Sequence, residues 1–501
     1  MNSIFKKNII ATLLLVSCFA ISQNKKPNIV IIYVDDLGYG DIGINGAIGV
    51  KTPFVDELAK NGLNFSDAHS SASTCTPSRY SLLTGSYAFR NNAAILEGDA
   101  PLIIDTKKET LPKMLQKAGY KTGVVGKWHL GLGNGKIDWN KRVGLGPKEV
   151  GFDYSFLIPA TGDRVPTVFL ENQRVVNLDP KDPITVSYGT RIDGGYPLGR
   201  EVPEMLKMHT DPYHQGAITN GISRIGHMKG GKSALWIDEK IPFVLSEKAT
   251  DFINKEKENP FFLYFSLHDI HQPRIANKKF VESSTMGPRG DVIAQMDWCV
   301  GEITKVLKKQ KLLDNTLIIF TSDNGPILDD GYVDYAIELL GDHKPGGKYK
   351  GSKYSVFEAG TRMPTIVHWP AKVKPGKSQA LLSQLDLYAS LADLVNQKIE
   401  KNAAPDSENH LSSWLGESQR GREFLLEEAY TYGLRMGKWK YIQPKDKPVP
   451  GWITQKFVDP GFRKEMQLFD LEKDPSEENN IAENHPEIVK KMEQKLQEIL
   501  K

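Results

Sequence analysis

The sequence predicts an α/β fold in which helices sandwich a large, mostly parallel sheet. Short apolar runs alternate with amphipathic segments between residues 27 and 395, and this alternation is typical of βαβ units. After about residue 400 the pattern changes to alternating strands followed by one helix. A chain of 501 residues is also longer than one compact core usually holds. We therefore expect a large domain over 27–395 and a smaller α+β domain with a short antiparallel sheet over 400–501.

The first 22 residues are typical of a secretory signal. Two lysines precede an apolar run that ends in the small-residue pattern A-I-S, so we expect cleavage after Ser22 and export to the periplasm or the medium. The segment 15–18, LVSC, also resembles a lipoprotein box. In that alternative, Cys18 would carry a lipid and anchor the protein to the outer membrane. No later segment is long and apolar enough to span a membrane.

Charge and cysteine content exclude some classes of protein. The net charge is +3, and two of the positive charges lie in the signal segment, so nucleic-acid binding is not expected. Of the three cysteines, Cys299 falls on the apolar face of a helical pattern at 291–309. We expect Cys299 to be a packed thiol. The alternative for an exported protein is a disulfide with Cys75.

Local patterns predict each element of the large domain. The run PNIVIIYVDD at 27–36 is apolar almost throughout, as in a strand that is buried on both faces. The segment 52–62 begins with Thr-Pro and ends with glycine, which is typical of a helix. The same reasoning predicts strands at 121–126, 261–271, 315–325 and 363–370, and helices at 110–120, 249–260, 291–309 and 382–395.

The smaller domain has a different pattern. The segment 433–443, GLRMGKWKYIQ, alternates as exposed antiparallel strands do. The segment 466–480 indicates a strand followed by a turn. The chain then closes with a helix whose predicted apolar stripe is Ile488, Met492, Leu496 and Ile499 or Leu500.

Polar side chains follow four of the predicted strands, at the edge where ligands bind in open α/β sheets. They are Asp35 and Asp36, Lys127 and His129, His268 and His271, and Asp323 and Asn324. Three carboxylates and one amide oxygen form a set suited to Ca²⁺ or Mg²⁺, whereas the thiolates that favour zinc are absent from it. Histidine and lysine beside such a metal indicate an anionic substrate whose charge must be neutralised.

The segment 75–85, CTPSRYSLLTG, runs from a loop into a predicted helix. Thr76 and Pro77 suit the start of that helix, where the macrodipole favours an anion. A cysteine protease would need a paired histidine and an orienting amide without a metal, and the acidic set argues against it. These residues alone leave Cys75 as a buried thiol, a disulfide partner, a nucleophile or a precursor.

Together these motifs resemble the type I, formylglycine-dependent sulfatases of the alkaline phosphatase superfamily. The segment 75–85 matches the signature C-x-P-x-R followed by S-x-L-x-T-G, and the resemblance runs from about residue 27 to residue 482. It is similar in particular to exported bacterial arylsulfatase-like enzymes that act on polysaccharides. It implies an alkaline phosphatase-like fold. It also implies that a maturation enzyme oxidises Cys75 to formylglycine (3-oxoalanine), whose hydrate supplies the nucleophilic oxygen.

The resemblance also implies the roles of the site residues. One Ca²⁺ would be held by Asp35, Asp36, Asp323, Asn324 and the modified Cys75. Arg79 would orient the hydrate, and Lys127 and Lys353 would bind the sulfate. His271 matches the histidine that protonates the leaving oxygen, and either His271 or Lys353 would assist its departure. His129 would take a proton from the remaining hydroxyl, so that sulfate leaves and the aldehyde returns.

Three insertions, at 161–166, 204–236 and 339–351, are rich in His, Lys, Arg and Asp, as a carbohydrate pocket is. The candidate substrate-binding residues in them are Thr161, Asp163, Arg164, His209, His214, Arg224, His227, Asp342 and His343. Thr161 stands where relatives often have a serine near the hydrate. The resemblance implies a sulfated oligo- or polysaccharide as the partner, and we expect 6-O-sulfated galactose or N-acetylgalactosamine.

Two alternative functions remain open. The first is a phosphonate or phosphate monoester hydrolase of the same superfamily, whose sites often bind a transition metal and lack the pair formed here by Lys127 and Lys353. The second is a non-catalytic protein that keeps the fold and binds sulfated glycans. The intact catalytic set argues against this second alternative.

Overall fold

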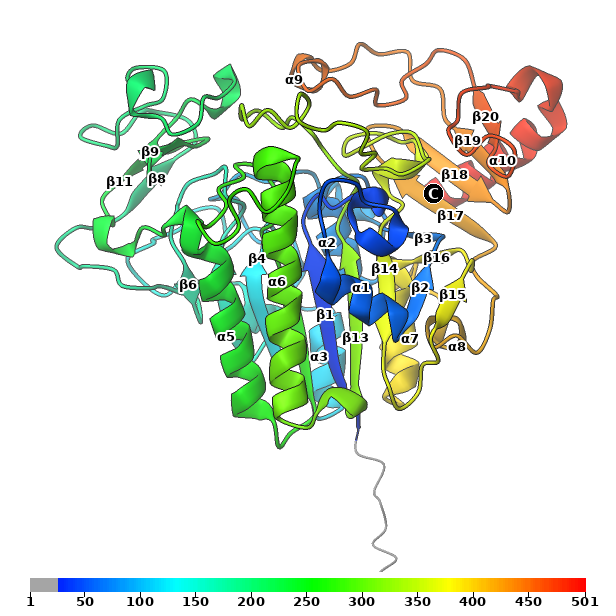
Figure 1. The fold of residues 1–501 in the computed structure, drawn as a ribbon, viewed down its shortest axis with the longest axis horizontal. Helices are drawn as coiled ribbons and strands as arrows, with labels where there is room; N and C mark the ends of the chain where they lie inside the picture. Colours follow the sequence, from blue (N-terminus) through cyan, green and yellow to red (C-terminus); the bar gives the residue numbers. More distant parts are fainter. Residues whose placement is uncertain (1–25) are drawn as a thin grey trace, which may run out of the picture.

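A computed structural model describes residues 26–501, in which a large sheet lies between two layers of helices (Figure 1). The predicted signal and Cys18 lie outside the described residues. The strands of the large sheet are β1 (Asn28–Val34), β2 (Leu63–Phe65), β4 (Lys121–Lys127), β5 (Tyr154–Ile158), β6 (Leu170–Glu171), β7 (Arg174–Val175), β12 (Phe261–Ser266), β13 (Thr316–Ser322), β14 (Thr365–His368) and β15 (Gly376–Ser378). Within residues 26–501 their order is β15-β2-β14-β13-β1-β12-β4-β5-β6-β7.

The centre of this sheet is parallel, which confirms the predicted fold class. β1 pairs in parallel with β12 and β13, β12 pairs in parallel with β4, and β4 with β5. Every residue of β1 is buried, as expected for a strand covered on both faces. β14 is antiparallel to both β13 and β2, a direction that the apolar run at 363–370 did not indicate.

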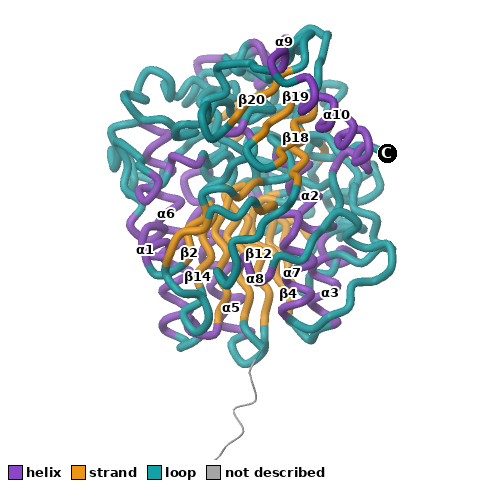
Figure 2. The backbone as a smooth tube through the Cα atoms, turned by 90° about the vertical axis from the view of Figure 1, so that its right-hand side faces the viewer, coloured by secondary structure: helices purple, strands orange, loops and turns teal. Residues whose placement is uncertain are grey.

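Helices cover both faces of the sheet, and Figure 2 shows them on either side of the strands. Their bounds are α1 (Pro53–Lys60), α2 (Cys75–Thr84), α3 (Leu111–Lys117), α4 (Pro147–Val150), α5 (Ile241–Glu256), α6 (Gly287–Lys309), α7 (Leu387–Leu394), α8 (Leu411–Trp414), α9 (Gly451–Thr454) and α10 (Pro486–Leu500). Alternate residues of β1 belong to different cores. Ile29 and Ile31 pack with α2, α3 and α7, whereas Val30 and Ile32 pack with α1, α5 and α6.

Neither cysteine within residues 26–501 forms a disulfide. Among residues 26–501, Cys75 and Cys299 are both free and buried. Cys299 lies on α6 in the core shared with β1, so the prediction of a packed thiol is confirmed. No helix in the same range is long and apolar enough to cross a membrane.

The end of the chain forms the predicted antiparallel sheet. Its strands are β17 (Phe424–Glu428), β18 (Tyr432–Met436), β19 (Trp439–Ile442) and β20 (Gln467–Asp470), and each pairs antiparallel with the next. α10 packs Met492, Leu496 and Ile499 against it as predicted, with Ile488 half-buried against the same cluster, and Val489 is buried there as well. We call residues 424–501 the C-terminal region. The remaining strands are β3 (Ala68–His69), β8 (Thr185–Ser187), β9 (Ile218–Thr219), β10 (Ile222–Ser223), β11 (His227–Lys229) and β16 (Leu382–Ser383).

Candidate functional site

The expected polar side chains meet at the carboxyl ends of the central strands. β1 lies between β12 and β13, with β4 beyond β12, so the residues that follow these strands share one edge. The Lys127 ammonium donates to Asp35 Oδ2, and the backbone N–H of Asp36 donates to Asp323 Oδ1 at 3.2 Å. Asn324 Nδ2 donates to Asp36 Oδ1 at 2.7 Å. The strand order thus brings together side chains that lie far apart in the sequence.

α2 brings Cys75 and Arg79 to the same place. Cys75 is the first residue of the helix, and its side chain is buried. Arg79, one turn later, donates from Nε and Nη2 to Asp323 Oδ2 at 3.0 and 2.7 Å. Because α2 is anchored in this way, the Cys75 side chain is fixed beside the acidic set, at a helix N-terminus that favours negative charge.

His129 contacts Cys75 directly. Its Nδ1 lies 3.3 Å from Cys75 Sγ, and its Nε2 lies 2.9 Å from the carbonyl oxygen of Leu96. Because a carbonyl only accepts, Nε2 carries the proton and Nδ1 is left as an acceptor toward position 75. Burial and the nearby Lys127 ammonium hold the pKa of His129 well below its usual value. The neutral imidazole is therefore set to accept a proton.

The backbone is strained at two of these positions. His129 has a φ of 51° and Asp36 a φ of 61°, in the left-handed region that residues other than glycine rarely adopt. Such strain persists where the surrounding structure imposes it, and it is common at functional sites. His129 contacts Cys75, and Asp36 belongs to the acidic set.

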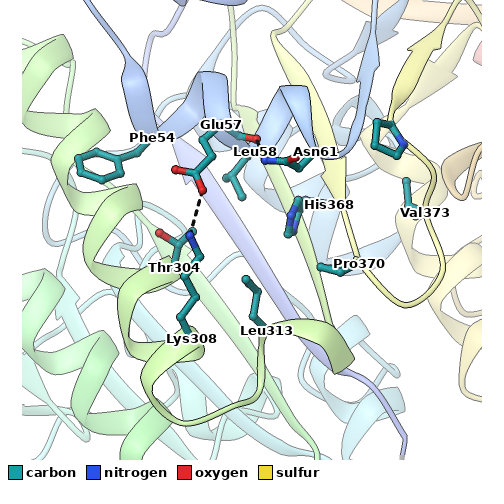
Figure 3. A pocket seen from close by; sticks show the side chains of 11 residues that line it. Phe54, Glu57, Leu58, Asn61, Thr304, Lys308, Leu313, His368, Pro370 and Val373 are labelled. Atoms are coloured by element: carbon teal, nitrogen blue, oxygen red, sulfur yellow. Dashed lines mark hydrogen bonds and ion pairs between the residues drawn. The ribbon is translucent and has the colours of Figure 1, made fainter.

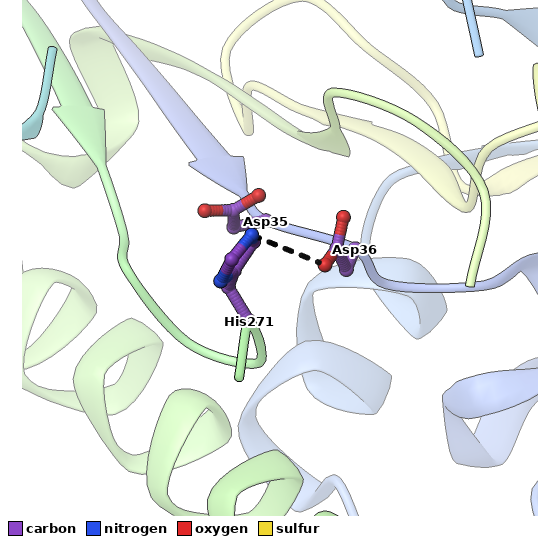
Figure 4. A group of neighbouring side chains, drawn as sticks. All are labelled: Asp35, Asp36 and His271. Atoms are coloured by element: carbon purple, nitrogen blue, oxygen red, sulfur yellow. Dashed lines mark ion pairs between the residues drawn. The ribbon is translucent and has the colours of Figure 1, made fainter. Parts of the chain in front are cut away.

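The acidic set has the oxygen chemistry of a cation site. Asp35 Oδ1 and Asn324 Oδ1 are buried without a hydrogen-bond partner among the described residues, an arrangement that is costly unless a ligand completes it. Burial and the neighbouring Asp323 raise the pKa of Asp35 well above its usual value. Figure 4 shows Asp35 and Asp36 gathered beside His271, whose Nε2 lies 3.8 Å from Asp36 Oδ2. A hard cation among these oxygens would fit the donor set.

Lys353 and His271 both approach the Asp36 carboxylate. The Lys353 ammonium donates to Asp36 Oδ2 at 3.0 Å and to Asp330 Oδ2 at 2.8 Å. His271 Nδ1 contacts the backbone carbonyl of Gln272, so Nε2 faces the carboxylates. Burial and Lys353 hold the pKa of His271 well below its usual value. The site therefore contains two ammonium groups and two neutral imidazoles around the Cys75 side chain.

A cavity of about 320 Å³ opens above Cys75, within the size range of small-molecule sites. Its walls combine charged groups with aromatic rings. The lining residues are Cys75, Ala94, Ile95, His129, Asp163, Arg164, Tyr213, His214, Ile225, His271, Asp330, Lys353, Tyr354, Tyr430, Trp452 and Lys456.

Comparison with known proteins identifies the family. The sulfatase family model matches residues 27–397, and a model described as "N-sulphoglucosamine sulphohydrolase, C-terminal" matches residues 349–501. The chain belongs to the sulfatase family. It is a type I sulfatase of the alkaline phosphatase superfamily, and hence a sulfuric ester hydrolase.

This sulfatase has relatives over nearly its whole length. It is 50% identical to an N-acetylgalactosamine-6-O-sulfatase of Bacteroides thetaiotaomicron, with 95% of this chain and 94% of the relative covered. It is 29% identical to human arylsulfatase A, over 96% of this chain and 89% of the relative. A structure solved in work on glycosaminoglycan metabolism by Bacteroides thetaiotaomicron superposes with a TM-score of 0.93, covering 95% and 99% of the two chains at 50% identity.

Four of the predicted substrate residues lie at the cavity of the sulfatase. Asp163, Arg164 and His214 line it, and Thr161 Oγ1 lies 3.3 Å from His271 Nδ1. Arg164 pairs with Asp163 at 2.6 Å, and His214 Nε2 lies 3.5 Å from the same carboxylate. Burial lowers the pKa of His214, but its hydrogen bonds with Asp163 and Asp211 raise it above the usual value overall. These charged groups suit hydroxyl groups of a sugar.

The other five candidates lie outside this cavity within the described chain. Arg224 is buried in a pair with Asp238 at 2.7 Å and donates to the carbonyl of Gly162, so it supports the loop of Asp163 rather than facing the cavity. His343 pairs with Asp41 at 2.8 Å. His209 and Asp342 are exposed, and His227 is half-buried on β11. The charged composition of the insertions did not distinguish these internal ion pairs from substrate contacts.

Sequence reasoning missed several lining residues. Asp330 lies only six residues after Asn324, in a segment whose LDDG pattern was available as a signal. Tyr430, Trp452 and Lys456 come from the C-terminal region. Nothing local in their sequence points to a cavity, because their position depends on how this region packs on the large sheet.

A second cavity, of about 370 Å³, lies at the opposite edge of the sheet (Figure 3). It is lined by α1, the end of α6 and the segment after β14, and its charged pair is Glu57–Lys308 at 3.0 Å. His368 pairs with Ile318 near the start of β13, so this cavity is on the far side from Cys75. It contains none of the predicted site residues.

Proposed function

We propose that this sulfatase removes a 6-O-sulfate from N-acetylgalactosamine or galactose in a glycan, using formylglycine formed from Cys75 and one Ca²⁺. The observation that carries the proposal is the position of the Cys75 side chain. It lies 3.3 Å from an acceptor nitrogen of His129, in the lining of a cavity, and beside an acidic set with two oxygens that have no partner within residues 26–501. The choice of sugar is supported by the 50% identical relative, which is named for N-acetylgalactosamine-6-O-sulfate.

The cation and the modified side chain would each be held by residues of this site. The cation would be held by Asp35, Asp36, Asp323 and Asn324 together with the modified side chain at position 75. When bound, it would supply positive charge for the sulfate oxygens and for the nucleophile. The hydrated aldehyde at position 75 would supply the attacking oxygen.

The remaining steps belong to side chains of the chain itself. Lys127 and Lys353 hold sulfate oxygens by charge-assisted hydrogen bonds, and Arg79 keeps Asp323 in place through two N–H groups. The anionic substrate favours protonation of His271 Nε2, which then donates a proton to the leaving oxygen. His129 Nδ1 would accept the proton of the second hydroxyl at position 75 as the C–O bond to sulfate breaks, so that sulfate leaves and the aldehyde is restored. General acid–base steps of this kind contribute about 10²–10⁴-fold each.

Two experiments test the proposal. The tryptic peptide that contains position 75, from protein made with a maturation enzyme, should have the mass of the aldehyde. The matured enzyme should release sulfate from 6-O-sulfated N-acetylgalactosamine. An unmodified thiol in fully active enzyme would contradict the proposed chemistry.

A trapping experiment tests the role of His129. The His129→Ala variant should accumulate a sulfated enzyme, visible by intact-protein mass spectrometry. Turnover by this variant at the parent rate would show that another group accepts the proton.

The second candidate function is hydrolysis of a phosphonate or phosphate monoester. A phosphonate monoester hydrolase of Agrobacterium radiobacter shares the fold at 17% identity and a TM-score of 0.57, which is a likeness of fold alone. The buried Lys127 and Lys353 beside Cys75 favour sulfate. Turnover of an aryl sulfate compared with a phenyl phosphonate ester separates the two functions. Glycan binding without any sulfate release would favour the non-catalytic alternative.

Three expectations from the sequence stay predictions. They are export through residues 1–22, lipidation of Cys18, and the division into domains at 27–395 and 400–501.

A further inference from the structure

Asp330 is a buried carboxylate in the cavity that the signature motifs do not include. It is 5% exposed and lines the same cavity as Cys75. Its Oδ2 accepts from Lys353 Nζ at 2.8 Å, and its Oδ1 lies 2.7 Å from Lys456 Nζ. The Tyr354 hydroxyl contacts the two oxygens at 2.9 and 3.1 Å. Asp330 therefore joins a lysine of the site to a lysine of the C-terminal region.

The position of Asp330 restricts the Lys353 ammonium. This ammonium has three N–H groups, and within residues 26–501 it donates to Asp36 and to Asp330. With two donors fixed by the two carboxylates, the direction of the third is defined, and the Lys353 side chain lines the cavity. A flexible four-carbon side chain is thereby held in one geometry.

A carboxylate in an anion-binding cavity needs a counter-charge. Lys353 is shared between Asp36 and Asp330, so it cannot neutralise both. Lys456 supplies the second positive charge, and it is only 8% exposed, which is rare for lysine unless it is paired. Without Lys456, Asp330 would repel the sulfate that Lys353 is placed to bind.

The C-terminal region holds Lys456 in place through packing. Trp452, on α9, makes edge contacts with Tyr354 and Tyr430, with ring centroids 5.1 and 5.6 Å apart. Ile453 is fully buried in a cluster with Ile327 and Tyr354. α9 is thus anchored to the segment that carries Lys353, and Lys456 follows two residues after its end.

We propose that Asp330 is a positioning residue that fixes the Lys353 ammonium toward the sulfate, and that Lys456 is the counter-charge that lets Asp330 do so beside an anionic substrate. The inference rests on the proposed role of Lys353 in holding sulfate. It makes the C-terminal region part of the reaction site rather than only a packing partner.

The test uses matured full-length enzyme and two substrates, 6-O-sulfated N-acetylgalactosamine and an aryl sulfate without a sugar. Lys456→Met should lower kcat/KM by about 10–100-fold for both substrates, because it acts on the sulfate end. Lys456→Arg should recover part of that loss. The matched control is Lys464→Met in the same region, whose side chain is 74% exposed in a pair with Asp446, and it should keep the parent rate.

A double-mutant cycle distinguishes two possibilities. In the first, which we call the relay, Lys456 acts through Asp330 on Lys353; in the second, Lys456 contacts the substrate directly. In the Asp330→Asn background, adding Lys456→Met should cost little more, because the two residues act through one interaction. Undiminished loss from Lys456→Met in that background would overturn the proposal. So would a loss confined to the sugar substrate, which would place Lys456 against the sugar instead.

Thermal unfolding and the activity of Lys353→Met separate loss of the proposed interaction from other causes of lost activity. Thermal unfolding identifies variants that fail to fold. If Asp330→Asn is one of them, the comparison of Lys456→Met with Lys456→Arg on both substrates tests the role of Lys456 instead. Turnover of the aryl sulfate but not of the sugar sulfate would reject the proposed substrate while leaving the relay fully testable. Parent-level activity of Lys353→Met would reject the role of Lys353 and the relay with it.

Discussion

Two buried groups of acidic side chains in this sulfatase resemble each other as sets of residues but use their oxygens differently. We name the first the catalytic cluster after its proposed role, and it comprises Asp35, Asp36, Asp323 and Asn324. The interface cluster joins β3 and the segment after Lys353 to the C-terminal sheet. It comprises Asp67, His69, Glu358 and Glu427, with Arg362, Arg435 and Lys440. Asp35, Asp36 and the neighbouring His271 lie close enough together to hold a metal ion, and so do Asp67, His69 and Glu358.

The two clusters differ in how many of their oxygens lack a hydrogen-bond donor rather than in their charge. Each cluster has three carboxylates and three Arg or Lys partners, so a charge count does not separate them. In the interface cluster, Glu358 accepts from Arg362 and Arg435 at 2.6 and 2.9 Å. In the catalytic cluster, Asp35 Oδ1 and Asn324 Oδ1 have no partner within the described residues. Proximity of acids suggests a metal, but only oxygens left unsatisfied beside a cavity indicate where a ligand is needed.

Removal of the reacting side chain should have the largest effect. We expect Cys75→Ala to reduce sulfate release to background, a loss on the order of 10⁶-fold if the nucleophile is lost entirely. The melting temperature should change little, because one small buried side chain replaces another. Sulfate release and thermal unfolding of the same preparation measure both quantities. Residual turnover within about 100-fold of the parent would show that Cys75 does not carry the nucleophile.

Breaking the interface cluster should lower stability and leave activity nearly unchanged, the opposite of the effect of Cys75→Ala. Glu358→Gln leaves three buried cations short of one carboxylate, so we expect the free energy of unfolding to fall by about 3–5 kcal/mol. Activity of the folded protein should stay within about twofold of the parent. The control is Glu57→Gln, which breaks an exposed pair with Lys308 and should cost less than about 1 kcal/mol. A loss of activity as large as that of Cys75→Ala would remove the distinction between the clusters.

Calcium should stabilise the protein through one cluster alone. After chelation, Ca²⁺ added at 100 times its Kd should raise the free energy of unfolding by about 2.7 kcal/mol. Asn324→Ala should weaken this stabilisation, whereas Glu358→Gln should keep it despite the lower starting stability. Denaturant unfolding with and without Ca²⁺ measures the difference. The reverse pattern would place the metal at the interface.

Glu477 should give the smallest effect over any one pH unit. Burial and the neighbouring Glu358 raise the pKa of Glu477 from 4.5 to about 8, although Lys440 opposes the shift. The folded state therefore keeps a proton that the unfolded state releases, and the stabilisation is lost as pH rises from about 5 to 8. The slope for one proton is at most about 1.4 kcal/mol per pH unit. Glu477→Gln should flatten this part of the stability profile, and an unchanged slope would assign it to another group.

The parts of the molecule that could be predicted are those set by local pattern or by a short motif. The buried run at 27–36 and the strand order of α/β sheets together placed Asp35, Asp36, Lys127 and Asp323 at one edge. The antiparallel direction of β14 could not be predicted, because direction depends on which strands flank it. Arg224 and His343 were candidates because of their charge, yet both form internal pairs. Lys456 was missed because its place depends on the packing of Trp452 and Ile453.

The burial of Cys75 has a consequence for timing. Its side chain is 1% exposed, and nine of the ten residues of α2 are buried. Under the proposed function, a modifying enzyme must hold this segment in its own active site, which the finished fold does not permit. Oxidation would then compete with folding during biosynthesis, and a chain that folds first would be permanently inactive. The specific activity of a preparation would record the outcome of that competition and would not rise on later treatment with the modifying enzyme.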